Sequence, residues 1–161
     1  MKETTLCYIE KENKYLMLHR VKKINDVNEN KWIGVGGKIE KGETPTGCAK
    51  REILEETGLN ALDLNFRGLV NFKSDKWEEE DMYLFSIYSF EGSIKECDEG
   101  NLEWIDKKDL FSLTLWEGDK IFLKLIEDKE RKPFYLSLRY KGEELIKHKL
   151  LENYDFSGVV I

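Results

Sequence analysis

The strongest constraint in this sequence is a helix whose two ends can be located from residue types alone. Thr44 suits the N-cap position, Pro45 suits the first helical position, and Gly58 suits the left-handed residue that ends a helix. These signals predict a helix over residues 45–57. The glycine-bearing stretch before it, residues 33–39, predicts a short strand that another backbone or a ligand approaches closely.

One face of this predicted helix carries three carboxylates. Glu52, Glu55 and Glu56 are spaced i, i+3 and i+4, so at about 100° per residue they share an arc of roughly 100°. Glu43, just before the helix, can add a fourth. Such charges repel one another, and a hard divalent cation such as Mg²⁺ or Mn²⁺ would convert that repulsion into binding. The alternative is an ordinary solvated face of a charged helix.

Length and composition favour one folded domain over residues 1–161. The chain has 26 Lys and Arg against 32 Asp and Glu, a net charge of −6. It is therefore a poor general binder of nucleic acid or anionic membranes, unless divalent cations supply positive charge. No stretch approaches the roughly 20 apolar residues of a membrane span. The three cysteines form no CxxC pair, which favours free thiols and a cytoplasmic location.

The other patterns predict strands mixed with a second helix. Strand-like runs occupy residues 4–10, 15–21, 62–72, 82–90, 102–105 and 133–140, and helical patterns occupy 106–110 and 117–128. Residues 22–31 are expected to form a loop, and the acidic run at residues 78–81 a solvated turn. The state of residues 143–151 stays open. The order predicts an α/β (α+β) fold of layered sheet and helices.

The charged helix is part of a longer pattern over residues 37–59. The segment fits GX5EX7REUXEEXGU, where U is an apolar aliphatic residue, at every specified position: Gly37, Glu43, Arg51, Glu52, Ile53, Glu55, Glu56, Gly58 and Leu59. The complete match resembles the signature of the Nudix hydrolase family. This resemblance implies an α/β/α sandwich with a mixed sheet, a loop–helix–loop catalytic motif, and hydrolysis of a nucleoside diphosphate linked to another moiety.

The resemblance also implies roles for particular residues. The positions that match metal ligands are the carbonyl of Gly37 and the side chains of Glu52, Glu55 and Glu56. Arg51 resembles the residue that orients a signature carboxylate, and Glu43 resembles a supporting carboxylate. Many family members add a glutamate from a later loop, and Glu99 is in the matching place, with an ordinary acidic loop as the alternative. Lys38 is the first choice for a cation facing the phosphates, and Lys23 is a weaker choice, as are Arg20 and Lys22.

Two further segments resemble the MutT-like oxidised-purine nucleoside triphosphatases. Residues 30–38 read NKWIGVGGK, and residues 115–119 read LWEGD. In that subgroup a tryptophan stacks on the base and a nearby acid accepts hydrogen bonds from the base edge, which points to Trp116 and Asp119. Trp32 resembles an aromatic residue that flanks the pocket.

Ordinary structural roles remain open for these residues. Trp116 could be a core aromatic residue, and Asp119 a helix-start acid favoured by the macrodipole. Ile33 and Gly118 depart from the animal-type pattern, which has an asparagine and a second acid at these positions.

The resemblance implies conversion of oxidised purine nucleoside triphosphates, such as 8-oxo-dGTP, to the monophosphate and pyrophosphate. The cofactor would be Mg²⁺, with Mn²⁺ as a second candidate, and the role would be sanitation of the nucleotide pool and thereby DNA repair. The alternatives are hydrolysis of ADP-ribose, a dinucleoside polyphosphate or a capped RNA end, and a non-catalytic nucleotide-sensing module. Neither a stable nucleic-acid partner nor a membrane is expected, and the chain would be a monomer or a homodimer.

Overall fold

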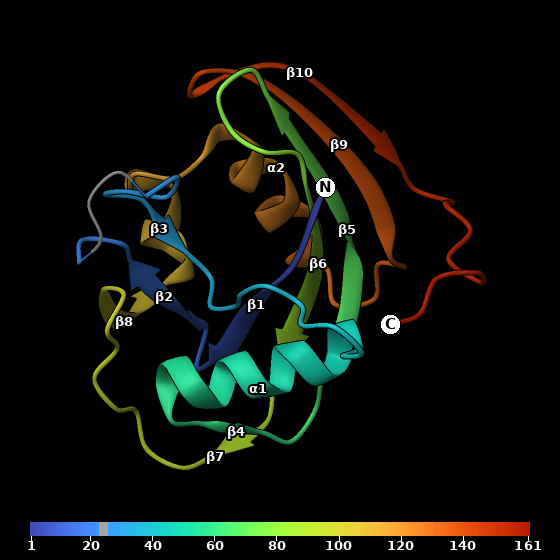
Figure 1. Cartoon of the computed structure of the whole chain (residues 1–161). Coiled ribbons are helices and arrows are strands. Elements are labelled where there is room, and N and C mark those ends of the chain that lie inside the picture. The colour runs from blue at the N-terminus through green and yellow to red at the C-terminus, as the bar shows by residue number, and fades with distance from the viewer. Residues whose placement is uncertain (23–25) are drawn as a thin grey trace.

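The computed structural model describes residues 1–22 and 26–161, which form a mixed sheet with a helix on each face (Figure 1). In chain order the elements are β1 (Lys2–Lys11), β2 (Lys14–His19), β3 (Trp32–Ile33), α1 (Pro45–Thr57), β4 (Asn60–Ala61), β5 (Asn65–Ser74), β6 (Glu80–Ile87), β7 (Phe90–Glu91), β8 (Asn101–Asp106), the 3₁₀ helix η1 (Lys107–Ser112), α2 (Glu117–Ile126), β9 (Phe134–Lys141) and β10 (Glu144–Leu151).

The main sheet has the strand order β10-β9-β5-β6-β1-β2-β3, with β8 also paired to β2. β1 is parallel to β6 and β5 is parallel to β9, whereas the other pairs of this sheet are antiparallel. β1 pairs with β2 beside their shared turn, and the two strands then continue next to different neighbours, β6 and β8. The backbone of Val35 bonds to that of Cys7, and Lys38 forms a bridge with Thr4. The glycine-bearing loop therefore runs along the edge of β1.

The two helices lie on opposite faces of the sheet. Successive side chains of β1 alternate between these faces, so two β1 residues an odd number of positions apart contact different helices. Thr5 of β1 lies 3.4 Å from the thiol of Cys48 in α1. Tyr8, three residues further along, packs its ring against Phe122 of α2 at a centroid separation of 6.0 Å. This arrangement confirms the predicted fold class of layered sheet and helices.

Helix α1 begins and ends where its capping residues predict. The Thr44 hydroxyl accepts a hydrogen bond from the Gly47 N–H at 3.0 Å. At the other end Gly58 has φ of 81° and donates its N–H to the Leu54 carbonyl. A left-handed residue carries little strain when it is glycine, so the helix ends without distortion.

Three predicted elements differ from the structure, and one segment whose state was open is assigned by it. Glu80 and Asp81 are not part of a solvated turn, because they pair with Lys2 and Glu3 of β1 and so belong to β6. The predicted strand over residues 82–90 divides into β6 and β7, and the predicted strand over residues 62–72 begins later, at Asn65 of β5. The residues just before that range, Asn60 and Ala61, form the short strand β4, which pairs with β7. The open segment at residues 143–151 forms β10, whose hairpin with β9 turns at Gly142.

The last ten residues return across the sheet to the start of α1 (Figure 1). Tyr154 stacks on Tyr135 at 4.9 Å, Phe156 contacts Phe66 at 5.1 Å, and the Thr46 hydroxyl donates to the carbonyl of Ile161. Cys7, Cys48 and Cys97 are buried free thiols. Within the described ranges, neither helix has the length and apolar character to cross a membrane.

Candidate active site

A pocket of about 300 Å³ lies between the sheet, the loop before α1 and the start of α2. Its lining contains two sets of residues with different chemistry. The acidic set consists of Glu52, Glu56 and Glu99 with the backbone of Gly36, Gly37 and Lys38. The second set, called the base set below, combines aromatic, apolar and hydrogen-bonding side chains. It consists of Thr4, Leu6, Asn28, Ile33, Phe72, Glu80, Met82, Trp116 and Asp119.

The acidic set combines burial with like charge. Glu56 of α1 is buried and accepts a hydrogen bond from the Gly36 N–H at 3.2 Å. Burial raises its pKa, and a hydrogen bond and charge repulsion from Glu99 raise it further. Burial also raises the pKa of Glu52. Carboxyl groups held this close favour either a proton or a cation between them.

The donor set fits a hard divalent cation. Carboxylate and carbonyl oxygens are the ligands that Mg²⁺ and Mn²⁺ prefer. A Cβ at Gly37 would lie 2.5 Å from the carboxyl carbon of Glu52, so a side chain there would fill the space beside this carboxylate. Among the described residues, no three His, Cys, Asp or Glu side chains are already grouped tightly enough to hold a metal ion. Binding would therefore require rotation of these side chains or water ligands, which Mg²⁺ usually retains.

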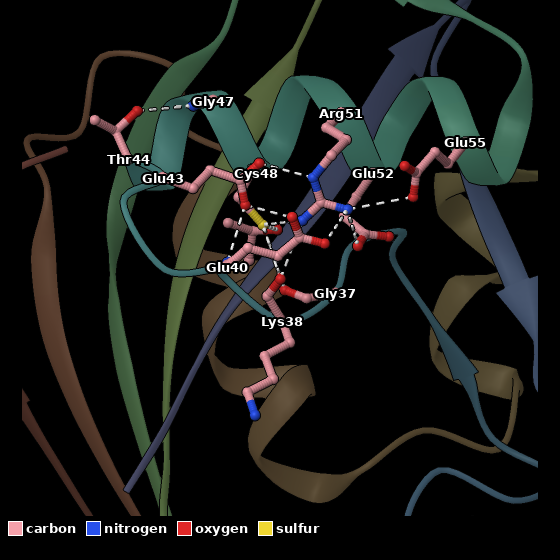
Figure 2. Close-up of polar contacts among 11 residues, drawn as sticks. Gly37, Lys38, Glu40, Glu43, Thr44, Gly47, Cys48, Arg51, Glu52 and Glu55 are labelled. Atoms are coloured by element: carbon pink, nitrogen blue, oxygen red, sulfur yellow. Dashed lines mark hydrogen bonds and ion pairs between the residues drawn. The ribbon is translucent and has the colours of Figure 1, made fainter.

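Arg51 connects the signature carboxylates Glu43, Glu52 and Glu55, as Figure 2 shows. Its Nε and Nη2 donate to the two oxygens of Glu43 at 2.7 and 2.9 Å. Its Nη1 donates to Glu52 at 2.8 Å and to Glu55 at 3.2 Å. The hydrogen bonds from Arg51 lower the pKa of Glu43 to about 2. Arg51 thus holds Oε1 of Glu52 without lining the pocket itself, and Glu52 is one of the pocket-lining residues.

Arg51→Lys is expected to reduce kcat/KM about 10- to 100-fold, the usual cost of losing a residue that orients a metal ligand. A lysine has a single ammonium group and cannot bind Glu43 through two parallel bonds while also holding Glu52. Steady-state kinetics at saturating metal would measure the loss, with the exposed neighbour Lys50→Gln as the control. Equal activity of the two variants would contradict this positioning role.

The site residues predicted from the sequence fall into four groups. Gly37, Lys38, Glu52, Glu56, Glu99, Trp116 and Asp119 line the pocket. Glu43, Arg51 and Glu55 form the ion-pair network outside it, and the Glu55 side chain is 58% exposed. Trp32 is also outside the lining, with its ring stacked on His19 at 4.4 Å and 5°, while its neighbour Ile33 faces the pocket. Lys23 lies outside the residues that the structure describes.

Arg20 lines the pocket and is bonded to two carboxylates. It donates to Glu99 at 2.8 Å and to Asp26 at 2.9 Å, and its side chain is 11% exposed. Arg20 therefore holds Glu99 within the acidic set, much as Arg51 holds Glu52. A role of Arg20 toward phosphate stays a prediction, and no local pattern in the sequence indicates its contact with Glu99, 79 residues away.

Trp116 is fixed on several sides. Its Nε1–H donates to the side-chain oxygen of Asn28 at 2.8 Å. The ammonium of Lys31 lies 4.5 Å above its ring, and the rings of Phe72 and Tyr140 meet it edge-on at 5.5 and 5.0 Å. Trp116 is 5% exposed, so it is packed like a core residue and also forms part of the pocket wall.

Asp119 lies in the first turn of α2, two residues after Glu117. It is 5% exposed, and within the described part of the chain its carboxyl has no hydrogen-bond partner. Burial raises its pKa to about 8, with a further contribution from the negative charge of Glu80 and a smaller opposing effect of Lys31. A buried carboxyl without a partner, at a pocket wall, is suited to a ligand that brings N–H donors.

Comparison with known proteins identifies the family of this fold and pocket. The NUDIX domain model matches residues 2–126. An oxidized purine nucleoside triphosphate hydrolase from Danio rerio is 34% identical over 124 residues, which is 76% of this chain and 78% of that protein. The protein of the same name from Mus musculus is 32% identical over 102 residues, which is 63% of this chain and 65% of that protein. The chain belongs to the Nudix hydrolase family.

A solved structure supports the same assignment at the level of the fold. The mMutator MutT protein from Bacillus halodurans superposes with a TM-score of 0.83 at 26% sequence identity, covering 93% of this chain and 97% of that one. The predicted family and fold are therefore confirmed.

Proposed function

We propose that this Nudix hydrolase converts oxidised purine nucleoside triphosphates, such as 8-oxo-dGTP, to the monophosphate and pyrophosphate with Mg²⁺ as cofactor. The observation that carries the proposal is the joining of the acidic set and the base set in one pocket. A nucleotide has a polyanion at one end and a flat base with hydrogen-bonding edges at the other. The names of the Danio rerio and Mus musculus relatives, oxidized purine nucleoside triphosphate hydrolases, support this choice of substrate.

Of the predicted metal ligands, Glu52, Glu56 and Glu99 with the carbonyl of Gly37 line the pocket and are proposed to hold the cation. Glu55, whose exposed side chain bonds to Arg51, would have to turn toward the pocket to join them. When bound, Mg²⁺ would supply positive charge to the phosphate oxygens and would activate a water for attack at phosphorus. Arg51 and Arg20 orient Glu52 and Glu99. Lys38 lines the same pocket and would add positive charge near the phosphates.

The base would bind at the other set of residues. Trp116 offers an immobilised aromatic surface, and base–aromatic stacking contributes about 1–3 kcal/mol. Asp119 in its ionised form can accept two neighbouring N–H groups from a guanine-type edge. Because Asp119 is buried, a base without those donors would leave its carboxylate unsatisfied.

A kinetic screen tests the proposed function. With Mg²⁺, 8-oxo-dGTP is expected to give pyrophosphate with a higher kcat/KM than dGTP, dATP, ADP-ribose, a dinucleoside polyphosphate or capped RNA. Chelation of the metal is expected to reduce turnover to background, and Mg²⁺ or Mn²⁺ should restore it. Release of inorganic phosphate, preference for another nucleotide, or binding without turnover would each contradict the proposal.

Three further proposals concern the domain organisation, the location and the oligomeric state of the protein. We propose that residues 1–161 form one domain, because β9 and β10, which lie beyond the matched family model, extend the same sheet. We also propose a cytoplasmic location, which the three free thiols favour, and a monomeric or homodimeric state. Light scattering on the purified protein distinguishes the two oligomeric states.

A further inference from the structure

Glu80 brings a second carboxyl group to the base set. It is the first residue of β6, lines the pocket, and has a side chain that is 17% exposed. One of its oxygens accepts a hydrogen bond from the Thr4 hydroxyl at 2.6 Å, and the other lies 3.4 Å from the ammonium of Lys2. These contacts from the neighbouring strand β1 hold the carboxyl at the sheet surface that forms this part of the pocket.

Glu80 and Asp119 reach the pocket from different elements. Glu80 extends from the sheet, whereas Asp119 is in the first turn of α2, which packs over that sheet. The charge of Glu80 contributes to the raised pKa of Asp119, so the two carboxyl groups are close enough to interact. Two acidic groups from separate elements favour a base that presents N–H donors on two separate edges.

A carboxylate has about four acceptor positions, and the contacts with Thr4 and Lys2 leave some of them available to a ligand. The neighbouring pocket residues Leu6, Phe72 and Met82 have no group that could replace a hydrogen bond to Glu80. A ligand that presents a lone pair to this carboxylate would therefore meet repulsion, and one that presents an N–H would be favoured.

Ordinary guanine and its oxidised form differ in this respect. Guanine has N–H donors at N1 and at the exocyclic amino group, but N7 carries a lone pair. Oxidation at C8 places a hydrogen on N7, which turns an acceptor into a donor on the opposite edge of the base. A pocket with one carboxyl for each edge fits the oxidised base and disfavours the ordinary one.

We propose that Glu80 determines specificity by accepting the N7–H of an 8-oxopurine while Asp119 accepts the donors of the opposite edge. The proposal rests on the proposed function, because it assigns a source of selectivity to the same pocket. It assigns Glu80 no part in metal binding or in the chemical step.

Glu80→Gln tests this role, since the amide keeps an acceptor for Thr4 but can also donate to the N7 lone pair of ordinary guanine. The ratio of kcat/KM for 8-oxo-dGTP to that for dGTP is expected to fall about 10-fold or more, with turnover of dGTP maintained or increased. Thr4→Val, which removes the hydroxyl that holds Glu80, is expected to lower the ratio in the same direction by a smaller factor. Glu78→Gln, in the same acidic run but exposed, is the matched control and should leave the ratio unchanged.

Binding without catalysis separates this inference from the proposed function. Tryptophan fluorescence titrations with 8-oxo-dGMP and dGMP, in the absence of metal, report on the pocket alone. A preference for 8-oxo-dGMP that Glu80→Gln removes supports the inference even if no triphosphate is hydrolysed. An unchanged preference in Glu80→Gln, or an equal loss for both nucleotides, overturns it even if 8-oxo-dGTP is hydrolysed as proposed.

Discussion

Glu56→Gln is expected to lower kcat about 100- to 1,000-fold while leaving the metal-free protein at least as stable as the wild type. The loss follows from the place of Glu56 in the acidic set, where its carboxyl interacts with that of Glu99. A glutamine has no charge to hold a cation or to take a proton. The factor corresponds to about 2.7–4.1 kcal/mol of transition-state stabilisation.

The expected stability has a separate physical cause. Glu56 is 8% exposed, and both burial and Glu99 disfavour its ionised form. Glutamine is nearly the same size, can accept the Gly36 N–H with its carbonyl oxygen, and removes the buried charge. Sites that favour function at the expense of stability commonly behave in this way.

Thermal unfolding without metal and steady-state kinetics with Mg²⁺ measure the two effects. Glu55→Gln is the comparison variant, because Glu55 lies outside the pocket and its exposed side chain bonds to Arg51. It should lose less activity than Glu56→Gln. Undiminished turnover by Glu56→Gln would exclude Glu56 from the catalytic centre.

The parts of the molecule that sequence predicts best are those fixed by local chemistry. Helix α1 has the predicted bounds because Thr44, Pro45 and Gly58 act on backbone groups within a few residues of themselves. The spacing of Glu52 and Glu56 also places both on the pocket side of that helix. These inferences need helical geometry alone and no knowledge of the remaining chain.

The parts that sequence did not predict depend on contacts between distant segments. Glu80 belongs to a run that looks like a solvated turn, and its position is decided by the parallel pairing of β6 with β1, more than seventy residues earlier. Asn28 lies in a segment without periodicity, and its hydrogen bond to Trp116 joins residues 88 positions apart. Alternation along β6 could have indicated that Glu80 and Met82 share a face, but not that this face forms a pocket.

The loop before α1 explains how the two sets of pocket residues are brought together. Ile33 belongs to the base set and is followed by Gly34, which also lines the pocket. Gly36 and Gly37, two residues further along the loop, contribute backbone to the acidic set. A Cβ at Gly36 would lie 1.9 Å from the Thr5 carbonyl, so the absence of a side chain lets the loop run against β1. The distance between the base and the phosphates is thereby set by a few residues of backbone that pair with one strand.

Asp119→Asn is expected to lower kcat/KM for guanine-type nucleotides about 100-fold and to remove a pH dependence of their binding. The wild-type carboxyl has a pKa raised to about 8, so at pH 6.5 it is mostly protonated and cannot accept two N–H groups. Affinity should therefore rise up to about tenfold per pH unit until about pH 8, where the carboxylate form predominates. Asparagine offers one acceptor and one donor group at every pH, and its donor opposes the N–H groups of the base.

Burial sets the sign of this effect, and two charged neighbours modify it. Glu80 from β6 raises the pKa of Asp119, and Lys31 lowers it by a smaller amount. Because the folded pKa lies above the ordinary value of 3.8, stability contributed by protonated Asp119 is present at low pH and is lost as the pH rises from about 4 to about 8. The Asn variant should lack this loss of stability.

Two measurements from pH 6.5 to 8.5 test these trends: binding of 8-oxo-dGMP without metal, and thermal unfolding. The exposed Asp109→Asn is the control. A pH dependence that persists in Asp119→Asn would assign the titration to another group and remove Asp119 from base recognition.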